Sequence, residues 1–240
     1  MDSLPQEIID EIIDNLPLSS LRSSSLVARR WRTRSQQRVL QKIGFRSESM
    51  VHHWYMVILS NLGGVSSYVR SVGFRDIIEW RDPELFGLVL RRFTSLTALE
   101  ISDTEIPEEM LEHTLHGEKV TSLYLRSLRR CSLSTMISTI FAFPNLRDLA
   151  IVDLEISWGG RSPACTVLSP RRPLRSLLVR GRGSGTVAEA LADHRFTSRC
   201  LTLDAQPQNI QKLLIHTSVT IVELVLVGVC LLCGGPQEHK

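Results

Sequence analysis

The heptapeptide LTALEIS at residues 96–102 decides how the chain folds, because its pattern recurs along the sequence. Its apolar residues stand at the first, fourth and sixth positions. The same template occurs in VTSLYLR (120–126), LRDLAIV (146–152) and LRSLLVR (174–180), with weaker copies at 69–75, 198–204 and 221–227. The central apolar residues are 23 to 28 residues apart, at Val72, Leu99, Leu123, Leu149, Leu177, Leu201 and Leu224. A unit that returns at this interval is an internal repeat, and its short apolar runs predict buried strands.

Helix-like segments separate most of these strands. The segment 82–93 begins with Asp82 and Pro83, residue types that favour a helix start, and its apolar residues share one face. Comparable patterns occur at 107–117, 133–144, 185–196 and 207–218, whereas 157–173 is rich in glycine, proline and serine and predicts a loop. Strands that alternate with helices predict an α/β fold with a parallel sheet and helices outside it.

The template resembles the LxxLxL signature of leucine-rich repeats, whose units are about 20–29 residues long. The resemblance covers residues 65–231 and implies a solenoid with a curved parallel sheet and outer helices; residues 232–240 form a tail. The position that carries Asn or Cys in that family is occupied by Thr104, Leu154 or Gln206. We therefore expect an irregular, divergent solenoid.

The segment 177–206 presents an alternative, because Gly183-x-Gly185-x-x-Ala188 follows a strand and Asp204 lies about twenty residues further on. This spacing is typical of a dinucleotide-binding fingerprint and would indicate a nicotinamide enzyme. The fingerprint usually occupies the first strand of a large doubly wound domain, but here only a short segment follows Asp204. We therefore interpret the glycines as a turn between a repeat strand and its helix, and expect no cofactor.

Residues 1–45 do not fit the repeat. An apolar stripe along 8–16 predicts one amphipathic helix, and 18–31 and 33–43 predict two more. The order Leu4-Pro5-x-Glu7-Ile8, Ile12, Leu16, Leu21, Val27, Trp31, Leu40 resembles the F-box, a three-helix segment that docks on a Skp-family adaptor in a cullin-containing ubiquitin ligase. The resemblance implies that the adaptor-facing residues are Leu4, Pro5, Ile8, Ile12, Leu16 and Leu21, whereas Val27, Trp31 and Leu40 hold the helices together. Residues 46–64 would form a helical connector.

The leading functional hypothesis is a substrate-recognition adaptor without catalytic activity, whose helices join a Skp-family adaptor and a cullin while its repeats bind a target protein. An interaction scaffold outside any ligase, with the helices capping the solenoid, is the alternative. The basic run from Arg29 to Arg34 is interpreted as a solvated helix face, with a nuclear-import or nucleic-acid patch and a contact to an acidic adaptor surface as the other options.

Composition and the remaining residues predict no nucleic-acid, membrane, metal-binding or catalytic function. A net charge of +3 does not indicate a nucleic-acid partner. The longest apolar run, at 219–232, contains Glu223 and is too short to span a bilayer of about 30 Å, so we expect no membrane partner. The five sparse cysteines and the acidic N-terminus favour a cytoplasmic or nuclear location. The pairs His113/His116 and Cys230/Cys233 lack the companions of a metal site, so we expect neither a bound metal nor catalytic residues.

Overall fold

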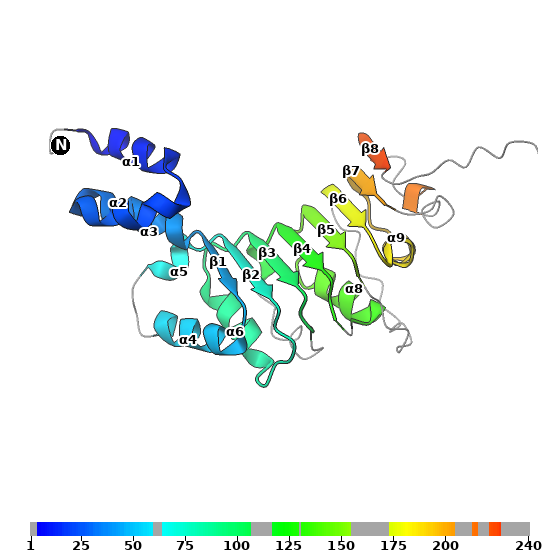
Figure 1. Cartoon of the computed structure of the whole chain (residues 1–240). Helices are drawn as coiled ribbons and strands as arrows, with labels where there is room; N and C mark the ends of the chain where they lie inside the picture. Colours follow the sequence, from blue (N-terminus) through cyan, green and yellow to red (C-terminus); the bar gives the residue numbers. More distant parts are fainter. Residues whose placement is uncertain are drawn as a thin grey trace, which may run out of the picture.

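The computed structural model describes residues 4–59, 64–106, 117–129, 131–154, 173–204, 213–215 and 221–226. Within these residues, three helices precede a sheet of eight parallel strands that alternates with further helices (Figure 1). The helices are α1 (Gln6–Asn15), α2 (Leu18–Val27) and α3 (Arg29–Leu40). The predicted α/β class, with a three-helix N-terminus and a parallel sheet, is confirmed.

The strands follow one another across the sheet in chain order, each parallel to the next. They are β1 (Lys42–Phe45), β2 (Ser71–Arg75), β3 (Ala98–Ser102), β4 (Ser122–Arg126), β5 (Asp148–Val152), β6 (Leu174–Arg180), β7 (Ser198–Leu203) and β8 (Glu223–Leu226). All seven repeat copies form strands. One earlier strand, β1, was not expected, so the sheet begins inside the range 1–45 that was assigned to the helical domain.

The pairing register follows the sequence repeat. Val72 pairs with Leu99, Leu99 with Leu123, and the series continues through Leu149, Leu177 and Leu201 to Leu224. Ile43 of β1 extends the row at its other end. Every member is buried except Leu224 at the edge. Because successive side chains of a strand point to opposite faces, this row fixes which residues face the helices and which face away.

Further helices alternate with the strands along the chain. They are α4 (Glu48–Leu59), α5 (Val65–Tyr68), α6 (Glu84–Arg92), η1 (Gly117–Lys119), α8 (Leu133–Phe141) and α9 (Ser184–Asp193). Helices α4, α6, α8 and α9 lie along the same side of the sheet (Figure 1). Of the predicted helices, 82–93, 133–144 and 185–196 are confirmed, whereas 107–117 and 207–218 lie largely outside the described residues, as does the loop 157–173.

Aromatic residues tie the first strands to the helices that cover them. Phe74 of β2 packs against Phe45 of β1, with ring centroids 5.3 Å apart, and against Phe86 of α6, with ring centroids 4.7 Å apart. Trp80 contacts both Phe74 and Phe86. Burying such rings contributes about 1.5–3 kcal/mol each. The segment 46–64, which the sequence predicts as a helical connector, contains helix α4, which packs on α6 and contributes the buried Val51 to this core.

The three N-terminal helices have a separate core. Ile9, Ile13 and Leu21 are buried together, and Leu4, Leu16, Trp31 and Val39 pack around them. Extended backbone at Ala28 (φ −155°, ψ 156°) ends α2 and allows α3 to begin at Arg29. The expected boundaries of the second and third helices are therefore corrected, because Trp31 belongs to α3.

Short polar residues end the strands in a left-handed backbone conformation. Asp76, Asp103, Ser127 and Asp153 follow their strands with φ between 46° and 59°. Each donates its backbone N–H to a carbonyl of the neighbouring strand, as Asp103 does to Arg126 at 3.0 Å. Aspartate tolerates this conformation better than most residues. Asp103 and Asp153 are therefore polar residues that end their strands.

The glycine turn at 183–185 provides a test of the repeat. Gly183 has φ +70°, and an added Cβ would overlap the carbonyl oxygen of Leu154 in the preceding unit. We expect Gly183→Ala to lower the free energy of unfolding by about 1 kcal/mol or more. Gly185 lies in the first turn of α9 and has no positive φ, so its backbone does not require a glycine. Gly185→Ala should be neutral or slightly stabilising in urea unfolding, and equal effects of the two changes would contradict this account.

Candidate protein-binding surfaces

Helix α1 has apolar side chains on two faces. Ile9 and Ile13 are buried in the three-helix core, whereas Ile8 is 43% exposed and Ile12 is 37% exposed. Neighbouring residues of a helix point about 100° apart, so one helix can pack with one pair and present the other. The outward pair forms an apolar surface that the described residues do not cover.

The six residues that the sequence assigned to an adaptor surface occupy different environments. Pro5 is exposed at the start of α1, beside the exposed Ile8 and Ile12. Leu4 and Leu16 are half-buried and pack on the three-helix core. Leu21 is fully buried inside that core. A partner would therefore touch Pro5, Ile8 and Ile12 directly, while Leu21 acts by holding α2 in place.

Helix α2 adds an exposed apolar surface that the sequence reading missed. Leu18 is 65% exposed, Leu26 is 81% exposed and Val27 is 59% exposed. The expectation that Val27 holds the helices together is wrong, because the buried positions of α2 are Leu21 and Ser24. The inward-facing Ser24 donates its hydroxyl hydrogen to the carbonyl of Ser20, at 2.8 Å, so its hydrogen bond is made within α2. Ser24 lies three residues after Leu21, and this helical spacing could have identified the inward face of α2 from the sequence.

Arginines of α3 hold α1 in position. Arg34 donates two hydrogen bonds to the carboxylate of Asp14, at 2.8 and 2.5 Å. Arg38 donates to the carbonyls of Ile13 and Leu16 at the end of α1, where a positive charge is favourable. Arg30 pairs with Gln6 at 3.2 Å. Part of the basic run therefore holds the helices together, instead of forming only a solvated face.

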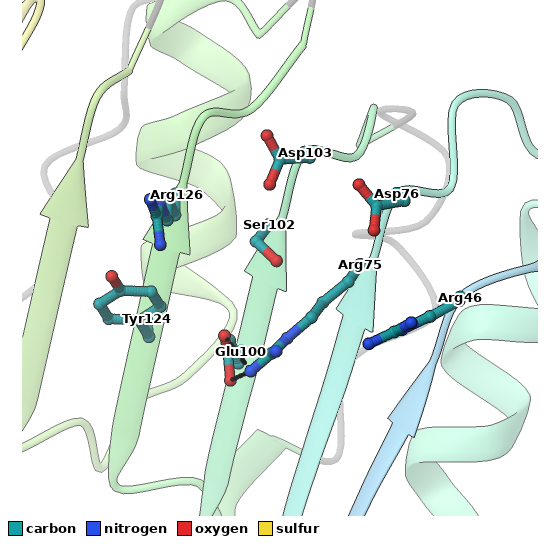
Figure 2. Close-up of a pocket in the computed structure, with 8 residues that line it drawn as sticks. All are labelled: Arg46, Arg75, Asp76, Glu100, Ser102, Asp103, Tyr124 and Arg126. Carbon is teal, nitrogen blue, oxygen red and sulfur yellow. Dashed lines mark hydrogen bonds and ion pairs between the residues drawn. The ribbon is translucent and has the colours of Figure 1, made fainter.

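The second candidate surface is the face of the sheet opposite the helices. On this face Arg75 binds Glu100 of the next strand at 2.7 Å, and Arg175 binds Asp148 at 2.8 Å. A hollow of about 430 Å³ opens near the carboxyl ends of β1 to β4 (Figure 2). It is lined by Arg46, Arg75, Asp76, Glu100, Ser102, Asp103, Tyr124 and Arg126. Ligands of open parallel sheets commonly bind at this end of the strands.

The described residues contain no metal-binding cluster. No group of three or more His, Cys, Asp or Glu side chains among them could hold a metal ion. Burial raises the pKa of the Cys131 thiol to about 12, so this cysteine stays protonated at neutral pH and is no nucleophile. His113, His116, Cys230 and Cys233 lie outside the described residues.

No helix in the described parts of the chain is long and apolar enough to cross a membrane.

Comparison with protein families places residues 1–40 in the F-box domain. The match covers α1, α2 and α3, which end at Leu40. A search of curated proteins finds no match to the chain. An F-box implies binding to a Skp-family adaptor, and F-box proteins are typically non-catalytic substrate adaptors of SCF-type ubiquitin ligases. The rest of the described chain is a parallel α/β sheet.

The Asp14–Arg34 pair gives a pH-dependent test of the helical region. The hydrogen bond from Arg34 holds the pKa of Asp14 below its usual value of 3.8. The pair therefore stabilises the fold above that pH, and its contribution is lost as the pH falls through the lowered pKa. We expect Asp14→Asn to lower the free energy of unfolding at pH 7 by about 0.2–1 kcal/mol, because both side chains are partly exposed.

The difference between Asp14→Asn and the unchanged protein should shrink in urea unfolding as the pH falls through the lowered pKa of Asp14, since both then lack the charge. Glu11→Gln on the same helix is the matched control, because the Glu11 side chain is exposed and forms no ion pair with any described residue. A difference that persists at low pH would contradict the electrostatic role of Asp14.

Proposed function

We propose that this protein is a substrate adaptor whose three N-terminal helices dock on a Skp-family adaptor and whose sheet binds a target protein for ubiquitination. The F-box match at residues 1–40 is the observation that carries this proposal. It is supported by the exposed apolar side chains on α1 and α2, which lie outside the three-helix core. The ligase would act by holding the target near the ubiquitin-bearing enzyme, which raises its effective concentration.

The proposed docking surface combines residues from two helices. Pro5, Ile8 and Ile12 supply its part on α1, and Leu18, Leu26 and Val27 supply its part on α2. Leu4, Leu16 and Leu21 support these residues from the core. Exposed aliphatic side chains in contiguous patches typically mark protein interfaces.

We further propose that the sheet is a divergent leucine-rich-repeat solenoid in which the repeats run from the first strand onward. The single row of paired apolar residues and the alternation of strands with outer helices support this reading. Thr104, at the family's ladder position, is buried and links two units: it accepts from the N–H of Ile77 and donates to the carbonyl of Ser102. On this division the helical domain ends at Leu40 and the repeat domain begins at Lys42.

One observation favours the alternative, a scaffold whose helices cap the solenoid. Helix α3 leads directly into β1 and contacts α5. The carbonyl of Gln41 accepts hydrogen bonds from the N–H groups of Arg70 and Ser71, at 2.9 and 3.0 Å. These bonds join the end of the helical region to the second strand, as a cap would.

Binding to a purified Skp-family adaptor tests the docking surface. We expect Ile8→Ala combined with Ile12→Ala to weaken binding at least tenfold in titration calorimetry, because each truncation removes an exposed apolar contact worth more than about 1 kcal/mol. The fold should survive, since both side chains point outward. Ile78→Ala is the matched control, because Ile78 is 61% exposed and lies after β2. Unchanged binding of the double variant to the Skp-family adaptor would contradict the ligase proposal.

Removal of residues 1–40 separates the two functions. The shortened chain keeps β1 and its buried Ile43 and Phe45, so we expect it to unfold cooperatively while losing all binding to the Skp-family adaptor. Thermal unfolding and adaptor titration measure the two properties. Loss of cooperative unfolding would instead favour the helical-cap alternative.

A further inference from the structure

The open face of the sheet carries a row of arginines near the carboxyl ends of its first strands. Arg75 of β2 pairs in register with Ser102 of β3, and Ser102 pairs with Arg126 of β4. Arg46 directly follows Phe45, the partner of Phe74, and so lies beside Arg75. Adjacent strands are about 4.8 Å apart, so the backbones of Arg46 and Arg126 are separated by about 15 Å. Long arginine side chains can converge on one group across this distance.

Only one of the three arginines in this row forms an ion pair with a described residue. Arg75 binds both oxygens of Glu100, each at 2.7 Å, and Lys42 lies 3.9 Å from the same carboxylate. Within the part of the chain that the structure describes, Arg46 and Arg126 form no ion pair. Figure 2 shows Arg46 reaching from the end of β1 toward β2, on the same hollow that Arg126 lines from β4. Two guanidinium groups that form no ion pair with a described residue therefore flank one hollow.

The hollow has room for a ligand group. Gly44 and Gly73 are paired neighbours on β1 and β2 and carry no side chains of their own; a Cβ at Gly44 would meet no atom within 4 Å, whereas the Arg75 and Glu100 side chains lie beside Gly73. A Cβ at Gly73 would lie 3.7 Å from the Glu100 carboxylate. A second hollow of about 440 Å³ adjoins the first and shares Asp103 with it. The two hollows, which we call the trough, lie next to each other at the strand ends, so an elongated segment could occupy both.

Carboxylates border the same trough. Asp76 and Asp103 occupy the left-handed positions directly after β2 and β3, next to the arginine row. Evenly spaced phosphates of a nucleic acid would meet these carboxylates as well as the arginines, which disfavours a polyanion. A segment that carries both signs of charge would satisfy both rows.

We propose that this trough recognises the target protein. It binds an extended peptide segment in which an anionic side chain, carboxylate or phosphate, lies next to a basic residue. The anionic group is held between Arg46 and Arg126, with Arg75 beside it, and the basic residue faces Asp76 and Asp103. Guanidinium groups bind both carboxylates and phosphates through paired hydrogen bonds. This inference rests on the proposed adaptor function, because it names the chemistry of the target.

Selection from a displayed library of random twelve-residue peptides tests the proposal with the full chain as bait. We expect the unchanged protein to enrich peptides with an acidic residue beside a basic one. Arg46→Glu combined with Arg126→Glu should abolish this enrichment. Arg92→Glu combined with Arg199→Glu is the matched control, because both arginines are exposed and line neither hollow. Absence of any acidic enrichment, or equal enrichment on the Arg46/Arg126 variant, would overturn the inference.

One selected peptide, synthesised with glutamate, phosphoserine or glutamine at the acidic position, separates the sources of charge in fluorescence anisotropy. The glutamine form should bind at least tenfold more weakly than the glutamate form. Tighter binding of the phosphoserine form would assign a phosphorylated target, and tighter or equal binding of the glutamate form an acidic one. Equal affinity of the glutamine form would refute the anion site.

Glu100→Gln should change the affinity for the peptide in the opposite direction to the arginine substitutions. It removes the charge that neutralises Arg75, so we expect two- to fivefold tighter binding of the glutamate peptide, with a slightly lower melting temperature because the ion pairs of Glu100 are lost. A loss of affinity would contradict the role of the arginines. Binding of all variants to the Skp-family adaptor should stay the same, so failure of the adaptor function and failure of the peptide site remain distinguishable.

Discussion

The row of paired apolar residues through the sheet, from Ile43 to Leu224, is the constraint on which the rest of the structure depends. A single strand with one helix cannot bury its apolar face, and each unit gains that burial only from its neighbours. The pairing holds every strand in one register, so all inward side chains meet the same layer of helices. A shift of one residue in any strand would expose its apolar side chains.

This constraint leaves the opposite face free to vary. On that face the strands carry charged and small residues, among them Arg75, Glu100 and Gly73. Their side chains serve no common core, so they can be selected for a partner. The three N-terminal helices are independent in a similar way, because Ile9, Ile13 and Leu21 form their own core and leave Ile8 and Ile12 for another protein. The two proposed recognition surfaces therefore share none of the residues that stabilise either part.

The sequence sufficed for the strands and their register, since Leu99, Leu123 and Leu149 pair as their template positions require. It failed at β1, because the four residues KIGF are too short and glycine-containing to match the template. It also misplaced Val27, since α2 has few apolar residues and its inward face includes a serine. Ion pairs such as Arg75–Glu100 join residues 25 positions apart and depend on the register, so the hollow on the open face could only be found in three dimensions.

Hydrogen exchange of the full chain, with and without a purified Skp-family adaptor, tests the central claim most directly. Two independent surfaces predict that the adaptor slows exchange in α1 and α2, while the amides of β2, β3 and β4 exchange at unchanged rates. Protection of those strands, or no protection of α1 and α2, would contradict the proposed division of this protein into an adaptor-binding helical part and a target-binding sheet.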